Sequence, residues 1–207
     1  MAISYPRQIP NVPIKTARMG LNVNQSFFES SFSRHVSVQS HAGGTTDQWE
    51  GMITTAPLSP SQVSEMSAWL ISLKGREKYF YAYDPDRRNP KGSASTASSN
   101  PVVNGGGQVG HSVQTSGWQA AVSNLLVAGD YFQIGEQYFM VMENVTSDGS
   151  GNATITFEPA IRNSLADQVA IIFNNPVLKA RLVENVQPWE SDEKRMSVIS
   201  FAWEEVL

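Results

Sequence analysis

The sequence predicts a mainly β fold with one α-helix packed on a sheet and an inserted compact β-module. Apolar and polar residues alternate in short segments, as they do in half-buried strands. Turn-forming Gly, Asp and Asn residues separate these segments. One segment alone has the periodicity of an amphipathic helix. The clearest alternation lies at residues 131–134, 138–142 and 153–157, where glycine-rich turns divide three strands of a compact β-module.

The helix is expected over residues 60–74. Ser59 is a good N-cap, Pro60 suits the first helical position, and Gln62 can complete a capping box. Gly75 can close the C-terminus. The apolar stripe is formed by residues at spacings of three and four, which are Val63, Met66, Leu70 and Leu73.

Further strands are expected at residues 21–32, 35–39, 48–54 and 79–83, and again at 168–173, 177–183 and 195–206. Val36 and Val38 alternate with polar residues, which predicts a half-buried strand. In the last segment, apolar residues fall on both faces of the strand, as in a central strand, and these are Val198, Ile199, Phe201 and Trp203. We therefore expect it to return to the sheet formed by residues 20–90.

This return predicts a discontinuous first domain. It would contain residues 1–91 and 163–207, with a linker at 92–107 and an inserted β-barrel-like module at 108–162. The linker is predicted because NPKGSASTASSNPVVNGGG is rich in Gly, Ser and Pro.

Three early prolines rule out a helix at the N-terminus and favour an extended arm, which is either frayed or laid on a neighbouring molecule. Two of the five tryptophans also remain as contact candidates, because one follows Gly117 and the other follows Pro188. The candidate interface residues are Tyr5, Pro6, Pro10, Pro13, Trp118 and Trp189.

The composition favours a folded protein with a low-charge polar surface. Of 207 residues, 41% are apolar and 16% charged, and none is Cys, so neither disulfides nor thiolate metal sites are expected. The sequence shows no apolar segment typical of a signal peptide or a membrane span. We therefore expect synthesis in a reducing cytoplasm and no membrane partner.

Charge is unevenly distributed along the chain. Residues 1–35 hold four basic residues against one acidic residue, and residues 184–207 hold six acidic against two basic. Opposite ends could meet within one subunit or between subunits. Between Gly92 and Ile161 there is no Lys or Arg. Because nucleic-acid grooves need cations, no nucleic-acid partner is expected.

No residue pattern predicts catalysis, a cofactor or a metal. The three histidines, His35, His41 and His111, lack ligand spacing. Serine nucleophile and phosphate-binding motifs are absent. Acid pairs occur at Asp84/Asp86, Asp192/Glu193 and Glu204/Glu205, and such pairs can serve a glycosidase only when folding brings them to the right distance. We interpret Asp84 and Asp86 as part of a charged turn.

The order of these parts resembles the distal tail protein of long, flexible-tailed bacteriophages. The resemblance lies in the strand QWEG, the phrase APLSPSQVSEMSAWLISLKG, an aromatic strand ending in Asp84-Pro85, a barrel-like insertion and a terminal strand. The phrases GDYFQIG and SDGSGNATITFEPAIR are also similar to phrases in phage tail and head-completion proteins.

The resemblance implies a virion protein that forms a ring, with a hexamer as the expected order, at the tip of the tail tube. It also implies that a β-sandwich with one flanking α-helix forms the ring, and that an inserted small β-barrel of OB-like type (oligonucleotide/oligosaccharide-binding) faces outward and attaches other components. The implied partners are copies of the chain itself, the tail tube protein, and baseplate hub or tail-fibre proteins. No catalytic residue is implied.

Three alternatives remain open. The first is another phage tail or connector subunit, such as a tail-completion or minor tail protein. The second is a carbohydrate-binding module of a receptor-binding apparatus, which would use Trp118, Trp189 or the tyrosine-rich strand. The third is an enzyme, with a glycosidase as the most plausible kind.

Overall fold

The computed structural model describes residues 3–95, 99–186, 188–191 and 196–206. The chain forms two compact units, each discontinuous in sequence. Unit 1 comprises residues 1–21, 49–85 and 177–207, and unit 2 comprises residues 22–48 and 86–176. The mainly β class with one α-helix is confirmed.

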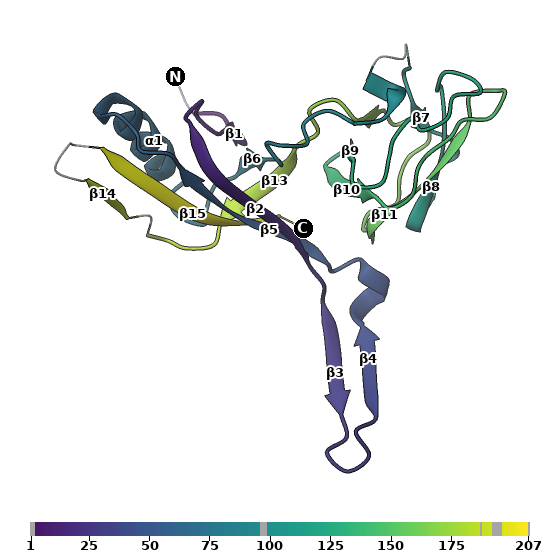
Figure 1. Ribbon diagram of the computed structural model, residues 1–207, viewed down its shortest axis with the longest axis horizontal. Coiled ribbons are helices and arrows are strands. Elements are labelled where there is room, and N and C mark those ends of the chain that lie inside the picture. Colours follow the sequence, from purple (N-terminus) through teal and green to yellow (C-terminus); the bar gives the residue numbers. More distant parts are fainter. Residues whose placement is uncertain (1–2, 96–98, 187, 192–195, 207) are drawn as a thin grey trace. The chain divides into compact units, whose positions relative to one another are not determined.

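Unit 1 is built on a seven-stranded sheet (Figure 1). Its strand order is β1-β6-β13-β15-β5-β2, and β14 pairs with β15 beside this path. The strands are β1 (Arg7–Gln8), β2 (Ile14–Asn22), β5 (Gln48–Thr55), β6 (Phe80–Ala82), β13 (Leu178–Leu182), β14 (Trp189–Ser191) and β15 (Ser197–Glu205).

Helix α1 (Pro60–Ser72) covers one face of this sheet (Figure 1). The Ser59 backbone N–H donates to Oε1 of Gln62 at 3.0 Å, as the predicted capping box requires. Trp69 is buried against Phe80 and Phe201, with ring centroids 5.2 and 5.6 Å away. The expected sandwich is therefore a sheet covered by a helix, and no second sheet occurs among the described residues of unit 1.

The closing strand β15 lies inside the sheet, between β13 and β5. Trp203 pairs with Gly51 of β5, and both Ile199 and Phe201 are buried. A Cβ added to Gly51 would lie 2.5 Å from the Trp203 ring and 2.4 Å from the carbonyl oxygen of Arg18. Glycine is therefore required at position 51, because the Trp203 ring and the backbone of β2 leave no space for a Cβ atom.

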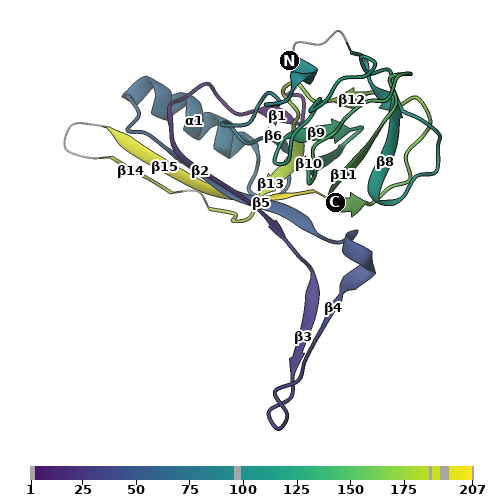
Figure 2. The same cartoon turned by 45° about the vertical axis from the view of Figure 1, so that its right-hand side comes forward.

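Unit 2 contains a six-stranded sheet that curls into a barrel (Figure 2). Its order is β12-β9-β10-β11-β8-β7. The end strands approach each other through the bridge Val102↔Ala170. Phe132, Phe139 and Phe157 fill the interior, with ring centroids 4.6–5.5 Å apart. The strands are β7 (Val102–Val103), β8 (Gly110–Ser116), β9 (Tyr131–Ile134), β10 (Gln137–Val141), β11 (Ala153–Ile161) and β12 (Ile171–Ile172).

The segment expected to be a linker, residues 92–107, is instead part of unit 2 where it is described. Val103 is fully buried in the barrel, and Ala94 in the short helix η2 (Ser93–Ser95) is 1% exposed. The buried carboxylate of Asp130 accepts hydrogen bonds from the Lys91 and Gly92 backbone N–H groups. A few small apolar residues and backbone hydrogen bonds thus anchor a segment whose composition resembles a linker. Residues 96–98 lie outside the described part of the chain.

The boundaries of the insertion also differ from those expected. Unit 2 begins again at residue 86 and extends to 176, beyond the predicted 108–162. It also includes the hairpin of β3 (Gln25–Glu29) and β4 (Val36–Ser40) and the short helix η1 (His41–Gly44), which were assigned to the first domain. Hydrogen bonds from the hairpin base to the barrel, described below, account for this grouping.

We predict that Gly51→Ala lowers the free energy of unfolding of unit 1 by about 1–3 kcal/mol, because the added methyl group overpacks the Trp203 contact. Thermal unfolding followed by tryptophan fluorescence measures this, since four of the five tryptophans belong to unit 1. Gly20→Ala is the matched control, because a Cβ there has no atom within 4 Å. Equal melting temperatures for the two variants would contradict the prediction.

Candidate assembly surfaces and a polar groove

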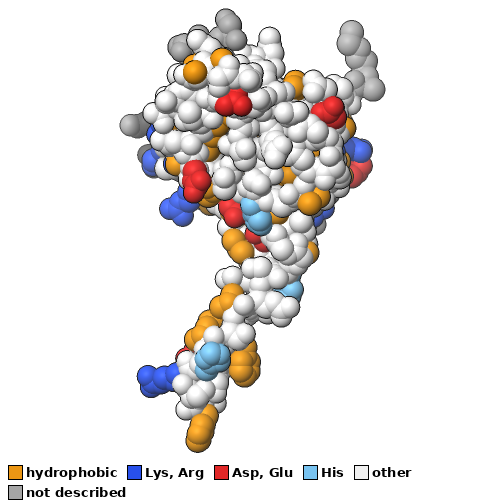
Figure 3. All heavy atoms as spheres, turned by 90° about the vertical axis from the view of Figure 1, so that its right-hand side faces the viewer, with side chains coloured by type: hydrophobic (Ala, Val, Ile, Leu, Met, Phe, Trp, Pro, Cys, Tyr) orange, Lys and Arg blue, Asp and Glu red, His pale blue; other side chains and the backbone are white. Residues whose placement is uncertain are grey.

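The β3–β4 hairpin is a two-stranded ribbon in which all ten strand residues are exposed (Figures 1 and 3). Phe27 is 62% exposed, Phe28 68% exposed, and Phe32 at the turn fully exposed. Val36 and Val38 are exposed as well. The prediction of a half-buried strand at residues 35–39 is therefore wrong about burial, because no described element covers this strand.

Pairing places the apolar side chains of the hairpin mainly on one face. Phe27 is opposite Val38, and Glu29 is opposite Val36. Side chains two residues apart on a strand share a face, so these three apolar groups form a continuous stripe. We call Phe27, Val36 and Val38 the hairpin stripe. Isolated two-stranded hairpins are marginally stable in water, and a surface packed on this stripe would add stability.

The base of the hairpin is held to the barrel by hydrogen bonds. The Asn24 backbone N–H donates to Oδ1 of Asp47 at 2.9 Å, and the guanidinium of Arg162 donates to the Asp47 carbonyl oxygen at 2.6 Å. His111 Nδ1 lies 3.0 Å from Oε2 of Glu158, and its Nε2 lies 3.2 Å from the carbonyl oxygen of Gly43. The exposed strands therefore extend from a fixed base.

The N-terminal arm, proposed as an interface, packs on its own chain. The Tyr5 hydroxyl donates to the Ser72 carbonyl oxygen at 2.7 Å, and β1 pairs in parallel with β6 directly after Pro6. Pro6 and Pro10 are partly buried, whereas Pro13 is exposed just before β2. Thus only Pro13 of this group presents an open surface.

The two candidate tryptophans have different environments. Trp118 is 5% exposed, lies 5.6 Å from the Phe173 ring, and donates through Nε1 to Oγ1 of Thr115 at 2.7 Å. It is a core residue of unit 2 and offers no platform for a sugar ring. Trp189 on β14 is 46% exposed and remains available for contact.

Unit 1 has a shallow groove of about 480 Å³ over β2, β5 and β15. Met52 and Val183 contribute exposed apolar side chains. Arg18 and Glu50 supply one charge of each sign. We call this the sheet groove. It adjoins β2, which forms one edge of the seven-stranded sheet.

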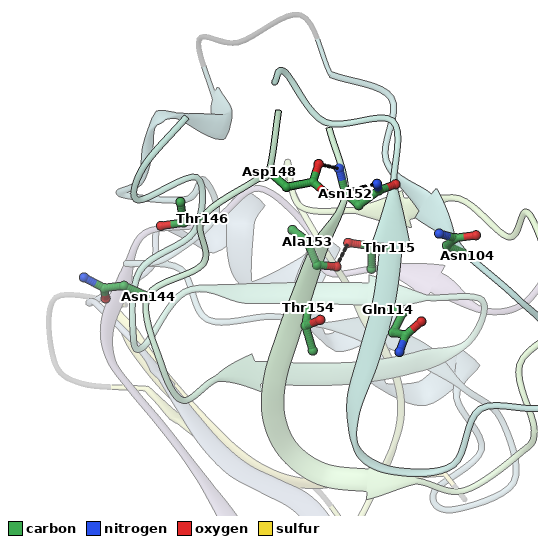
Figure 4. A pocket seen from close by; sticks show the side chains of 9 residues that line it. All are labelled: Asn104, Gln114, Thr115, Asn144, Thr146, Asp148, Asn152, Ala153 and Thr154. Atoms are coloured by element: carbon green, nitrogen blue, oxygen red, sulfur yellow. Dashed lines mark hydrogen bonds between the residues drawn. The ribbon is translucent and has the colours of Figure 1, made fainter. Parts of the chain in front are cut away.

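Unit 2 carries a groove of different chemistry, with a volume of about 620 Å³ (Figure 4). Asp148 is its one charged lining residue. Gln114 on β8 is paired directly with Thr154 on β11, and both are exposed. We call it the polar groove, and its lining residues are Asn104, Gln114, Thr115, Asn144, Thr146, Asp148, Asn152, Ala153 and Thr154.

The loop beside the polar groove is ordered by Asp148. Its Oδ1 accepts hydrogen bonds from the backbone N–H groups of Ser150 and Asn152, both at 2.8 Å, and its Oδ2 accepts one from Nδ2 of Asn152 at 3.1 Å. The hydrogen bonds from Asn152, followed by that from Ser150, lower the pKa of Asp148 below its ordinary value of 3.8. The carboxylate is therefore held in its ionised form.

Among the described residues, no group of three or more His, Asp or Glu side chains is placed to bind a metal ion. The acid pairs named above lie as follows. Glu204 accepts hydrogen bonds from Arg76 and Arg181 at 2.9 and 2.7 Å, and Glu205 is buried with an oxygen 3.1 Å from the Trp49 backbone nitrogen. The pair Asp192/Glu193 lies outside the described residues.

Among the described helices, none has the length and apolar character needed to cross a membrane.

A scan against protein-family models and a search of curated proteins found no match to this chain.

We predict that Asp148→Asn destabilises unit 2 at neutral pH, because it removes the charge that accepts hydrogen bonds from Ser150 and Asn152. Since the folded pKa is below 3.8, the contribution of Asp148 is complete above that value and is lost as the pH falls through the folded pKa.

Melting temperatures of both proteins between neutral and strongly acidic pH test this. The difference between them should be constant at neutral pH and should shrink in acid. Glu143→Gln controls for the change in net charge, because the Glu143 side chain makes no hydrogen bond to another described residue. A difference that persists unchanged in acid would contradict the prediction.

Proposed function

We propose that the chain is a structural virion subunit, a distal tail protein that forms a ring at the tip of a phage tail tube. The ring would connect the tube to baseplate hub or tail-fibre proteins. The observation that carries this proposal is the hairpin stripe, an apolar surface on two strands that no described element covers. The assembly is proposed to be a phage tail because the order of strands, helix and insertion in the sequence resembles that of distal tail proteins.

A ring of identical subunits needs two different surfaces on each copy, because head-to-tail contacts close by rotation. The hairpin stripe is one such surface. The sheet groove is suited to be the other, since it is shallow, partly apolar and next to an edge strand. Glu29 on the hairpin and Arg18 in the groove provide charges of opposite sign for this contact.

The large apolar side chains exposed on the hairpin favour assembly over a small-molecule activity. Large apolar side chains on an exposed strand are a liability for a monomer, because they promote pairing with other chains. Phenylalanines that become buried in an interface can each contribute on the order of 2 kcal/mol or more. A hairpin with three exposed phenylalanines is therefore an effective assembly element.

The native chain is expected to form a closed oligomer, with a hexamer as the expected ring. The double variant Phe27→Ser/Val38→Ser should weaken assembly at least 100-fold, or about 3 kcal/mol per contact, because it removes the central cross-strand pair of the stripe. Light scattering coupled to size-exclusion chromatography measures the mass, and negative-stain electron microscopy shows whether the oligomer is a ring.

Val109→Ser is the matched control, because Val109 is 68% exposed but lies outside the hairpin. It should assemble like the native chain. A native chain that remains monomeric at its highest soluble concentration would refute self-assembly. An open filament or a dimer in place of a ring would refute the distal tail role.

A further inference from the structure

The polar groove of unit 2 has the volume of a ligand site and an almost entirely polar lining. Its volume of about 620 Å³ falls within the roughly 300–1,000 Å³ typical of small-molecule sites. It is lined from separate segments, with Asn104 following β7, Gln114 on β8, Thr154 on β11, and Thr146 and Asp148 in the loop before β11 (Figure 4). Residues distant in the sequence therefore present their polar groups at one place.

Several of these groups have hydrogen-bonding capacity left over. The side chains of Asn104, Gln114, Thr146 and Thr154 make no hydrogen bond to any other described residue. An amide offers two donors and an acceptor, and a hydroxyl offers both roles. The groove thus presents a mixed array of donors and acceptors to a ligand.

The floor and rim of the groove are fixed before any ligand arrives. The Thr115 hydroxyl donates to the Ala153 carbonyl oxygen at 2.6 Å, which joins the two strands beneath Gln114 and Thr154. The carboxylate of Asp148 holds the rim loop through Ser150 and Asn152. A preformed site loses less conformational entropy on binding than a mobile one.

The charge and the lining determine which ligands fit. Asp148 is the one charge in the lining, and residues 92–161 contain no Lys or Arg, so phosphates, sulfates and acidic sugars are repelled. No aromatic residue lines the groove, so a nucleobase has no surface on which to stack. Ala153 is its one apolar residue, which disfavours lipids.

We propose that the polar groove binds a neutral oligosaccharide through its hydroxyl groups. Vicinal hydroxyls each donate and accept hydrogen bonds, which matches the amides of Asn104 and Gln114 and the hydroxyl of Thr154. The ionised carboxylate of Asp148 is available as a further acceptor at the rim. This activity is separate from ring formation and uses a surface other than the hairpin.

The test uses the fluorescently labelled full-length chain on an array of neutral, sialylated and sulfated glycans. Binding is expected to neutral glycans and to be lost when the same core carries a sialic acid or a sulfate. The strongest neutral glycan is then titrated calorimetrically. The variant Gln114→Ala/Thr154→Val should bind it at least tenfold more weakly, because each side chain supplies hydrogen bonds that its replacement cannot make.

Two control variants locate the site. Gln168→Ala removes an exposed amide of unit 2 outside the groove, and Trp189→Ala removes the exposed tryptophan of unit 1. Both should bind like the native chain. The absence of binding to every neutral glycan, equal binding to acidic forms, or undiminished binding by the groove variant would each overturn the proposal. The mass of the native oligomer, measured in the same samples, reports on ring formation independently.

Discussion

The contact between Trp203 and Gly51 is the constraint on which the arrangement of unit 1 depends. It lies where β15, the last strand of the chain, pairs with β5, formed some 150 residues earlier. Because β15 is flanked by β5 and β13, the sheet is incomplete until the end of the chain has been added. Of the residues between these two strands, 86–176 leave unit 1 and form most of unit 2, whereas 56–85 and 177–196 belong to unit 1.

The two parts of unit 2, the barrel and the hairpin, treat their strand edges in opposite ways. In the barrel, the bridge between Val102 and Ala170 brings the end strands together, so few backbone groups are left for other chains to pair with. The hairpin in the same unit keeps both strands exposed and carries large apolar side chains. The same sequence thus protects one set of strands and presents another. This contrast is one reason for the proposal that the hairpin is an assembly surface.

The hairpin stripe and the polar groove also differ in chemistry. Removal of the Phe27, Val36 and Val38 side chains from water lowers the free energy, so these residues suit a protein partner with an apolar surface. Gln114 and Thr154 gain little from burial alone and require a partner that returns hydrogen bonds. One protein could therefore use the first surface for assembly and the second for recognition without competition between them.

The sequence by itself determined the elements whose signals are local. The helix cap at Ser59, the alternation at Tyr131–Ile134 and the apolar character of β15 each follow from neighbouring residues, so helix, strands and the return of the last strand were predictable. The tertiary structure alone decided burial. Val36 and Val38 alternate like core residues yet are exposed, whereas Trp118 beside Gly117 resembles a surface residue yet is buried. Side-chain burial and the assembly of a groove from four segments depend on contacts between distant residues, which local patterns do not encode.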